Sequence, residues 1–335
     1  MIAAPRLSVV VCTRERPNDL ERCLRALTEQ TVRELDVIVV DNAPRTGDTR
    51  RVVDEAGVRY VLEPRPGLDR ARNAGLAAAR AASIAFTDDD AVPAIDWAAV
   101  VLATLAEPGV AGMAGAILPL ELETSAQRLF EQYLERMTRT RPRDERRVFR
   151  RPFPPSSAGH VGAGANMAFR REALDIVGPF DEAFDAGTAT HSGGDTEMFA
   201  RMIDAGLCLV YEPRAVVRHR HRRTVDALRR QLFGYGVGVY AFWTHRVTRY
   251  RDRDAFRFAL DTLRFHARRL PSALRGERGE LPPRLVLAEL AGSLWGPVAY
   301  AAARRRAARA DAVARSRPAV TPLARRDAEP EDRVR

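Results

Sequence analysis

Three consecutive carboxylates, Asp88, Asp89 and Asp90, follow directly after the apolar run 84–86. Adjacent carboxylates repel one another, so they need either full solvation or a neighbouring cation. Alternate side chains of an extended chain point to the same side, which places Asp88 and Asp90 together and turns Asp89 away. Because Mg²⁺ and Mn²⁺ prefer carboxylate oxygens, the triplet predicts a metal site, with a solvated acidic loop as the alternative.

Two further groups could complete such a site. Asp195 is an isolated carboxylate behind Gly193 and Gly194, at the predicted start of a helix, where it could act as a general base. Asp is also a favoured N-cap residue, so a structural role stays open. His219 and His221 lie among arginines at the end of a predicted strand; either could join the carboxylates at a Mn²⁺ or Mg²⁺ site, or both could be solvated.

The elements that must position these residues alternate over the first 115 residues. Continuous Val/Ile-rich runs at 7–11, 36–41, 58–62 and 83–86 are separated by helical patterns such as 68–82. This order is typical of a mainly parallel sheet with helices on both faces. Ligands bind at the carboxyl ends of such strands, so Thr13, Arg14, Asp41 and the 88–90 triplet should meet at one edge.

The rest of the chain is less regular at first and then helical. The charged, Pro-containing segment 139–160 predicts a long loop, and 162–178 a short strand that leads into a helix. A helix is expected at 196–205 and a strand at 208–211. From residue 222 onward the pattern is mainly helical, and the last 20 or so residues predict a disordered tail.

Six segments in this order resemble the family-2 inverting glycosyltransferases, which have the GT-A fold. They span about residues 6–222 and read SVVVCTRERPNDLERCLRAL, VIVVDN, RPGLDRARNAGLAAA, AFTDDDAVP, GAGANMAFRREAL and GGDTEMFARMIDAGLCLVYEPRAVVRHRHR. The resemblance implies a GT-A domain at 1–221, with a nucleotide-binding half at about 1–115 and an acceptor-binding half at about 116–221. A helical extension would follow at 222–315, and a tail at 316–335.

The resemblance also implies roles for single residues. The donor nucleotide would be bound by Thr13, Arg14, Asp41, Arg72, Asn73 and Asp88. A divalent metal, Mn²⁺ or Mg²⁺, would be held by Asp88, Asp90 and His219, with His221 as the alternative to His219.

On the acceptor side, the resemblance makes Asp195 the catalytic base. Asn166 and Gly194 would line the acceptor or sugar pocket; an ordinary turn asparagine is the alternative for Asn166. The family usually has an acidic residue just before the base. In this sequence Gly194 occupies that position, so no acidic residue directly precedes Asp195 to support it.

The implied reaction is transfer of a sugar from a nucleotide-diphosphate sugar to a hydroxyl of a glycan or lipid-linked acceptor. A nucleotidyltransferase is one alternative, but the loop CTRERPND after the first strand lacks the glycines that hold a triphosphate. An Arg-rich nucleic-acid-binding protein is another, but it leaves the acidic triplet unexplained. We therefore expect no nucleic-acid partner.

Charge, cysteine content and apolar runs indicate where in the cell the protein is found. The net charge is +10 without a single Lys, and ten Arg lie between residues 214 and 251 with one acidic residue. Helices in this region could bind an anionic membrane surface or pack on the core. Three scattered cysteines, no signal peptide and no uninterrupted apolar run of 18 residues predict a cytoplasmic protein without a spanning helix, peripheral to the membrane if it binds one.

Overall fold

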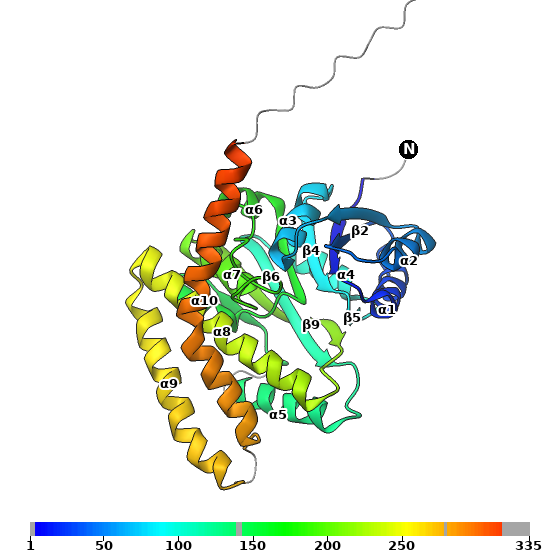
Figure 1. Ribbon diagram of the computed structural model, residues 1–335. Coiled ribbons are helices and arrows are strands. Elements are labelled where there is room, and N and C mark those ends of the chain that lie inside the picture. The colour runs from blue at the N-terminus through cyan, green and yellow to red at the C-terminus, as the bar shows by residue number, and fades with distance from the viewer. Residues whose placement is uncertain (1–3, 139–142, 278–279, 317–335) are drawn as a thin grey trace, which may run out of the picture.

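The structure is a computed structural model that describes residues 4–138, 143–277 and 280–316. Its centre is a mixed sheet with helices on both faces, and three long helices follow the sheet in the chain (Figure 1). The predicted α/β architecture, a GT-A-like sheet with a C-terminal helical extension, is confirmed. The predicted tail lies almost wholly outside the described residues.

The sheet has the strand order β3-β2-β1-β4-β8-β6-β9-β5, with β7 paired to β9. The strands are β1 (Leu7–Thr13), β2 (Leu35–Asn42), β3 (Arg59–Glu63), β4 (Ser83–Asp88), β5 (Ala91–Pro93), β6 (Val110–Pro119), β7 (Arg147–Phe149), β8 (Asn166–Arg170) and β9 (Cys208–His219). Strand β7 lies inside the segment predicted as a loop; it is held by antiparallel pairing to β9, a long-range contact without a local sequence signal.

The N-terminal half of the sheet is parallel, as predicted. In register, Thr13 of β1 lies beside Asp41 of β2, and Cys12 lies beside Asp88 of β4. Because all three strands run in one direction, their polar carboxyl ends meet at one edge. The expected convergence of Thr13, Asp41 and the acidic triplet is confirmed.

Strand β9 is much longer than the predicted 208–211. It pairs in parallel with β6 on both sides of a bulge, where the register jumps from Gly115–Glu212 to Ala116–Val216. Pro213 lies in this bulge, where no ladder hydrogen bond is required of it. The strand therefore continues past the proline to His219, which pairs with Ala91 of β5.

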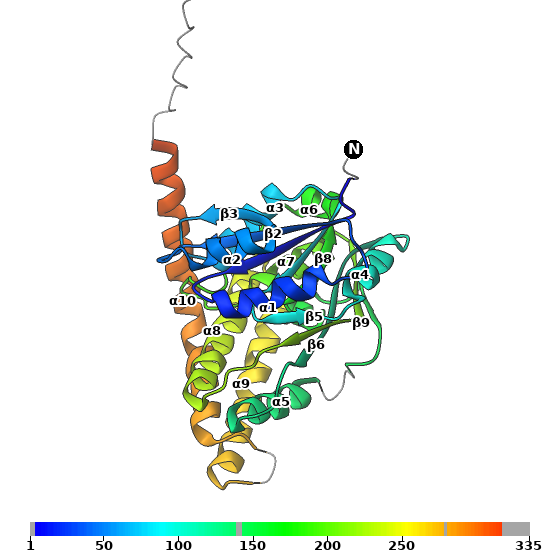
Figure 2. The ribbon, with the colours of Figure 1, turned by 90° about the vertical axis from the view of Figure 1, so that its right-hand side faces the viewer.

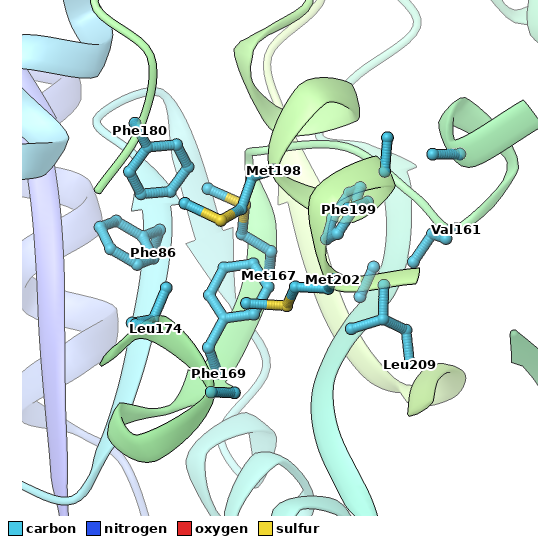
Figure 3. Packing of buried hydrophobic residues seen from close by; sticks show 14 of the residues in the cluster. Phe86, Val161, Met167, Phe169, Leu174, Phe180, Met198, Phe199, Met202 and Leu209 are labelled. Atoms are coloured by element: carbon cyan, nitrogen blue, oxygen red, sulfur yellow. The ribbon is translucent and has the colours of Figure 1, made fainter. Parts of the chain in front are cut away.

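Helices cover both faces of the sheet. Apolar residues of α1 (Pro17–Thr28), α2 (Asp48–Ala56) and α4 (Trp97–Ala106) form one core. Residues of α3 (Leu68–Ala78), α6 (Arg171–Val177), α7 (Gly194–Asp204) and the 3-10 helix Pro155–His160 form the other, with Phe86, Phe169 and Phe199 at its centre (Figure 3). Helix α7 begins two residues before the predicted start, and α3 ends four residues before the predicted end.

Helices α8 (Val225–Tyr250), α9 (Arg253–Leu274) and α10 (Pro283–Ser316) form a layer on the side of the molecule away from α1 and α2 (Figures 1 and 2). Helix α5 (Ser125–Thr138) packs on α8. Glycines allow α8 and α10 to approach closely: a Cβ at Gly236 would lie 2.2 Å from the carbonyl oxygen of Glu289. Through Ala241 and Phe242, α8 also joins the central core.

The segment Pro283–Arg309 of α10 is long and apolar enough to cross a membrane by length and composition alone, with a mean hydropathy of 1.3. This finding differs from the expectation of no spanning helix, because a window average tolerates the single Glu289 that interrupts the apolar run. In the folded chain 39% of that window is buried, which is the behaviour of a helix packed on one side.

Candidate active site

The acidic triplet lies at the carboxyl end of β4. Asp88 is the last residue of that strand, and Asp90 immediately precedes β5. Because β5 pairs antiparallel with β9, the end of β9 comes to lie beside the triplet. Sheet pairing, and not sequence proximity, therefore brings His219 to Asp90.

Asp88, Asp90 and His219 form a compact group in which one ligand atom of each lies within 4.8 Å of the others. The Nε2 atom of His219 is 2.9 Å from Asp90 Oδ1 and 3.7 Å from Asp88 Oδ2. Burial opposes protonation of His219, but the negative charge of Asp90, reinforced by Asp88, outweighs it and raises the pKa of the imidazole to about 10. The group is thus strongly attractive to positive charge.

The donor atoms of this group fit a hard divalent cation. Two carboxylates with one imidazole are a ligand set suited to Mn²⁺ or Mg²⁺. Apart from its ion pair with His219, the buried Oδ1 of Asp90 has no hydrogen-bond partner among the described residues. The side chain of Asp88 is 32% exposed, so the group is open to solvent on one side.

Asp89 lies outside the Asp88–Asp90–His219 group and has Thr13 as a partner of its own, but it shares Arg16 with Asp90. The Thr13 hydroxyl donates to Asp89 Oδ2 at 2.7 Å, and Arg16 donates to both Asp89 and Asp90 at 2.9 Å. Burial raises the pKa of Asp89 to about 7, although Arg16 acts to lower it. The sequence analysis missed Arg16, because nothing in local spacing distinguishes it from the exposed Arg14.

Asp41 lies next to Thr13 in the sheet and is almost fully buried. The Tyr60 hydroxyl donates to its Oδ2 at 3.0 Å, whereas its Oδ1 has no hydrogen-bond partner in the described parts of the chain. Burial raises the pKa of this carboxyl. An unmet acceptor at this edge of the sheet suits a ligand hydroxyl or N–H group.

Arg72 and Asn73 of α3 are engaged with protein groups. Arg72 is buried, and its Nη1 donates to Asp69 Oδ1 at 2.8 Å and to Asp185 Oδ2 at 2.7 Å. The Asn73 carboxamide exchanges two hydrogen bonds with the backbone of Phe180. Both residues therefore tie α3 to the segment that precedes α7.

Asp195 lies inside the first turn of α7, and the N-cap residue is Gly193. Two backbone N–H groups donate to the Asp195 carboxylate at 2.6 Å: Thr196 to Oδ1 and Gly164 to Oδ2. Burial raises the pKa of Asp195 with help from Asp185, and Arg72 acts in the opposite direction. The N-cap alternative for Asp195 is therefore wrong, because Gly193 is the N-cap residue. The Asp195 carboxylate is instead fixed by two N–H groups and is more basic than a solvated aspartate.

The second histidine of the 219–221 segment belongs to another contact. His221 is 3% exposed, and its Nε2 lies 2.7 Å from Glu131 Oε1 of α5. Its ring also meets Phe130 edge-on, with the ring centres 4.8 Å apart. His221 thus anchors α5, and the acidic group contains His219 in its place.

Asn166 is engaged inside the sheet. Its Nδ2 donates to the carbonyl oxygens of Ala116 and Ala215 at 2.9 and 2.8 Å, and its Oδ1 accepts from Trp97 Nε1 at 2.9 Å. The residue is 1% exposed. These contacts favour a structural role for Asn166, in which its side chain joins β8 to β6 and β9. They argue against the expected position in the acceptor pocket and against an ordinary turn asparagine.

Residues 8–178 match the profile of the family described as Glycosyl transferase family 2, which covers about half of the chain. The chain belongs to this family. Membership in this family disfavours the nucleotidyltransferase and nucleic-acid-binding alternatives.

Named relatives agree with the family. The chain is 32% identical over 238 residues to a pre-mycofactocin glycosyltransferase of Mycobacterium tuberculosis, a match that covers 69% of this chain and 46% of the relative. The chain therefore spans about half the length of that relative. It is 25% identical over 247 residues to the glycosyltransferase AglE of Haloferax volcanii, covering 71% of this chain and 74% of the relative.

A solved structure shares the fold. The mannosyltransferase PcManGT of Pyrobaculum calidifontis, in complex with GDP-Man and Mn²⁺, superposes with a TM-score of 0.51 and 22% sequence identity. The superposition covers 92% of this family-2 chain and 76% of the mannosyltransferase.

We predict that Asn166→Leu lowers the stability of this family-2 protein without weakening nucleotide binding. The substitution leaves two carbonyl groups and one indole N–H buried without partners, at about 1–3 kcal/mol for each group. Thermal unfolding should show a lower melting temperature, and titration with nucleotide an unchanged Kd. Normal stability with weaker sugar or nucleotide binding would restore Asn166 to the ligand pocket.

Proposed function

We propose that the chain is a metal-assisted, inverting glycosyltransferase that moves a sugar from a nucleotide-diphosphate sugar to an acceptor hydroxyl. The observation that carries this proposal is the group of Asp88, Asp90 and His219 at the sheet edge, with Asp195 held by two N–H groups on the second half of the fold. A cation-binding group and a separate base are the two parts that such a reaction requires.

Asp88, Asp90 and His219 would hold Mn²⁺ or Mg²⁺. The cation would neutralise the charge of the diphosphate leaving group. Support comes from the donor set and from the Mn²⁺ named with the Pyrobaculum mannosyltransferase. His219 binds a metal only as neutral imidazole, so metal and proton compete at this residue.

The donor nucleotide would lie along the edge formed by β1, β2 and β4. Asp41 offers a buried oxygen without a partner, and the exposed Arg14 is free to move toward a phosphate or base. Thr13 would act mainly by holding Asp89. Arg72 and Asn73 would shape the site from α3, because their known contacts are with Asp185 and Phe180.

Asp195 would take the proton from the acceptor hydroxyl. The acceptor oxygen then forms a bond to the anomeric carbon while the bond from that carbon to the diphosphate oxygen breaks, which inverts the configuration. Burial, which raises the pKa of Asp195, makes it a stronger base than a solvated carboxylate. The acceptor would be a glycan or a lipid-linked molecule; Gly194, expected to line its pocket, is buried against the Asp69 carboxylate.

We expect a nucleotide diphosphate to raise the melting temperature of the protein only when Mn²⁺ is present. A screen of UDP, GDP, dTDP and CDP would identify the base, since a ligand at about 100 times its Kd stabilises by roughly 2.7 kcal/mol. Asp90→Asn should abolish the Mn²⁺-dependent part of the shift. The matched control Asp226→Asn, at an exposed position of α8, should keep it. An unchanged shift in Asp90→Asn would move the metal elsewhere.

We expect Asp195→Asn to lose transfer almost completely while nucleotide affinity persists, because the amide cannot take up the acceptor proton. The loss should be on the order of 10²–10⁴-fold, the usual contribution of a positioned base. Release of nucleotide from the nucleotide sugar measures turnover, and the metal-dependent thermal shift measures binding. Normal turnover in this variant would exclude Asp195 as the base.

We further propose that the helical layer rests on an anionic membrane surface, on the cytoplasmic side. The outer face of α10 exposes a stripe of apolar residues: Leu287, Ala291, Leu294, Trp295 and Val298. Helix α9 exposes Phe256 and Leu260 beside a row of arginines, Arg253, Arg257, Arg264, Arg268 and Arg275. Apolar side chains flanked by arginine are suited to the interface of an anionic bilayer.

We expect the protein to co-sediment with vesicles that contain phosphatidylglycerol and to remain in solution with pure phosphatidylcholine. The double variant L294E/W295E should lose this binding, since both side chains are more than half exposed and would carry charge into the interface. Ile176→Glu is the matched control, because Ile176 is as exposed as Leu294, at 64%, and lies on α6. Equal binding by all three proteins would contradict the proposal.

A further inference from the structure

Gly194, which directly precedes the base, lies against a carboxylate from another helix. A Cβ at this position would lie 1.9 Å from Asp69 Oδ2, and its three nearest atoms all belong to the Asp69 carboxylate. The φ angle of Gly194 is not in the left-handed region, so the backbone itself would accept a side chain. The absence of a side chain at 194 is therefore explained by Asp69.

The carboxylate of Asp69 is buried, which costs free energy because the charge loses its contact with water. It lies in the first turn of α3 and is 1% exposed. Its Oδ1 accepts from Arg72, whereas its Oδ2 has no hydrogen-bond partner among the described residues. A buried carboxylate oxygen without a partner is destabilising, and such groups are concentrated at functional sites.

A chain of contacts connects Asp69 to the base. Asp69 and Asp185 share the Arg72 guanidinium, whose Nη2 lies 2.3 Å from the position of a Cβ at Gly164. The N–H of Gly164 donates to Asp195 Oδ2 at 2.6 Å. The Cβ of Asp195 is 3.4 Å from the same position beside Gly164. Arg72 is thus packed against the loop that holds the base.

We propose that Asp69 is a positioning residue for the base, which supplies from α3 the carboxylate that position 194 lacks. Asp69 fixes Arg72, and Arg72 fixes the loop of Gly164 and the charge around Asp195. This inference rests on the proposed function, because it assigns Asp195 as the base. In this proposal Asp69 supplies, from another helix, the carboxylate that is missing from position 194 beside Asp195.

The test moves the carboxylate from α3 to α7. The carboxyl carbon of a Glu at 194 would be two bonds from its Cβ, and Asp69 Cγ lies 2.6 Å from that Cβ position. In D69A/G194E the carboxyl group therefore returns to nearly the same place from the other helix. D69A/G194Q is the matched control, because it fills the same space without the charge.

Turnover is measured with the nucleotide sugar that the binding screen selects. Asp69→Ala should lower kcat about tenfold or more with little change in KM, as expected for lost positioning at the base. D69A/G194E should recover most of that loss, and D69A/G194Q should not. Equal recovery by Gln and Glu, or wild-type kcat in Asp69→Ala, would overturn the proposal.

A second measurement needs no activity. Gly194→Ala should lower the melting temperature in the wild-type background, where the Cβ meets Asp69, and should be tolerated in the Asp69→Ala background. The same destabilisation in both backgrounds would overturn the placement of Asp69. A wild-type protein that releases no nucleotide from any nucleotide sugar would instead refute the proposed function, and this thermal comparison would still decide whether Asp69 occupies the space.

Discussion

Repulsion between carboxylates limits how this site can be built. Six of them gather where the two halves of the fold meet: Asp88, Asp89 and Asp90 at the end of β4, and Asp69, Asp185 and Asp195 around α3 and α7. Among the described residues, three arginines and one histidine lie beside them. The Nη1 atom of Arg222 is 3.8 Å from Asp90 Oδ2. Arg16 bridges Asp89 and Asp90, Arg72 bridges Asp69 and Asp185, and His219 contacts Asp88 and Asp90.

This compensation is local and incomplete, which gives the two groups different chemistry. In the first group, burial opposes ionisation of Asp90, but the positive charges of His219 and Arg16 outweigh it and hold the pKa of Asp90 below its usual range. In the second group, burial and the charge of Asp185 raise the pKa of Asp195, which makes its carboxylate a stronger proton acceptor. In the proposed function, the same residue type would therefore serve metal binding at one place and proton transfer at the other.

The helices α8 and α10 pack on the part of the fold that contains α7. Ala241 and Phe242 of α8 belong to the central core, and His245 connects α7 to α10: its Nδ1 is 2.9 Å from the Tyr300 hydroxyl and its Nε2 is 3.8 Å from Glu197. The division of the chain at residue 221 remains our proposal from the sequence pattern. Packing crosses that boundary, so the helices that would contact a membrane also support α7, which carries Asp195.

The local sequence pattern was enough to predict the sheet and the edge at which the candidate site lies. Alternating strands and helices predicted the sheet, and the directions of β1, β2 and β4 predicted that Thr13, Asp41 and the triplet meet, since both follow from short-range periodicity. Only the tertiary structure decided which histidine joins the triplet, because the bulge at Pro213 sets the register of β9. It also decided that Asn166 is hydrogen-bonded inside the sheet, that Arg16 bridges Asp89 and Asp90, and that Asp69 fills the space at Gly194. Each of these depends on contacts between segments far apart in the chain, for which a single sequence carries no periodic signal.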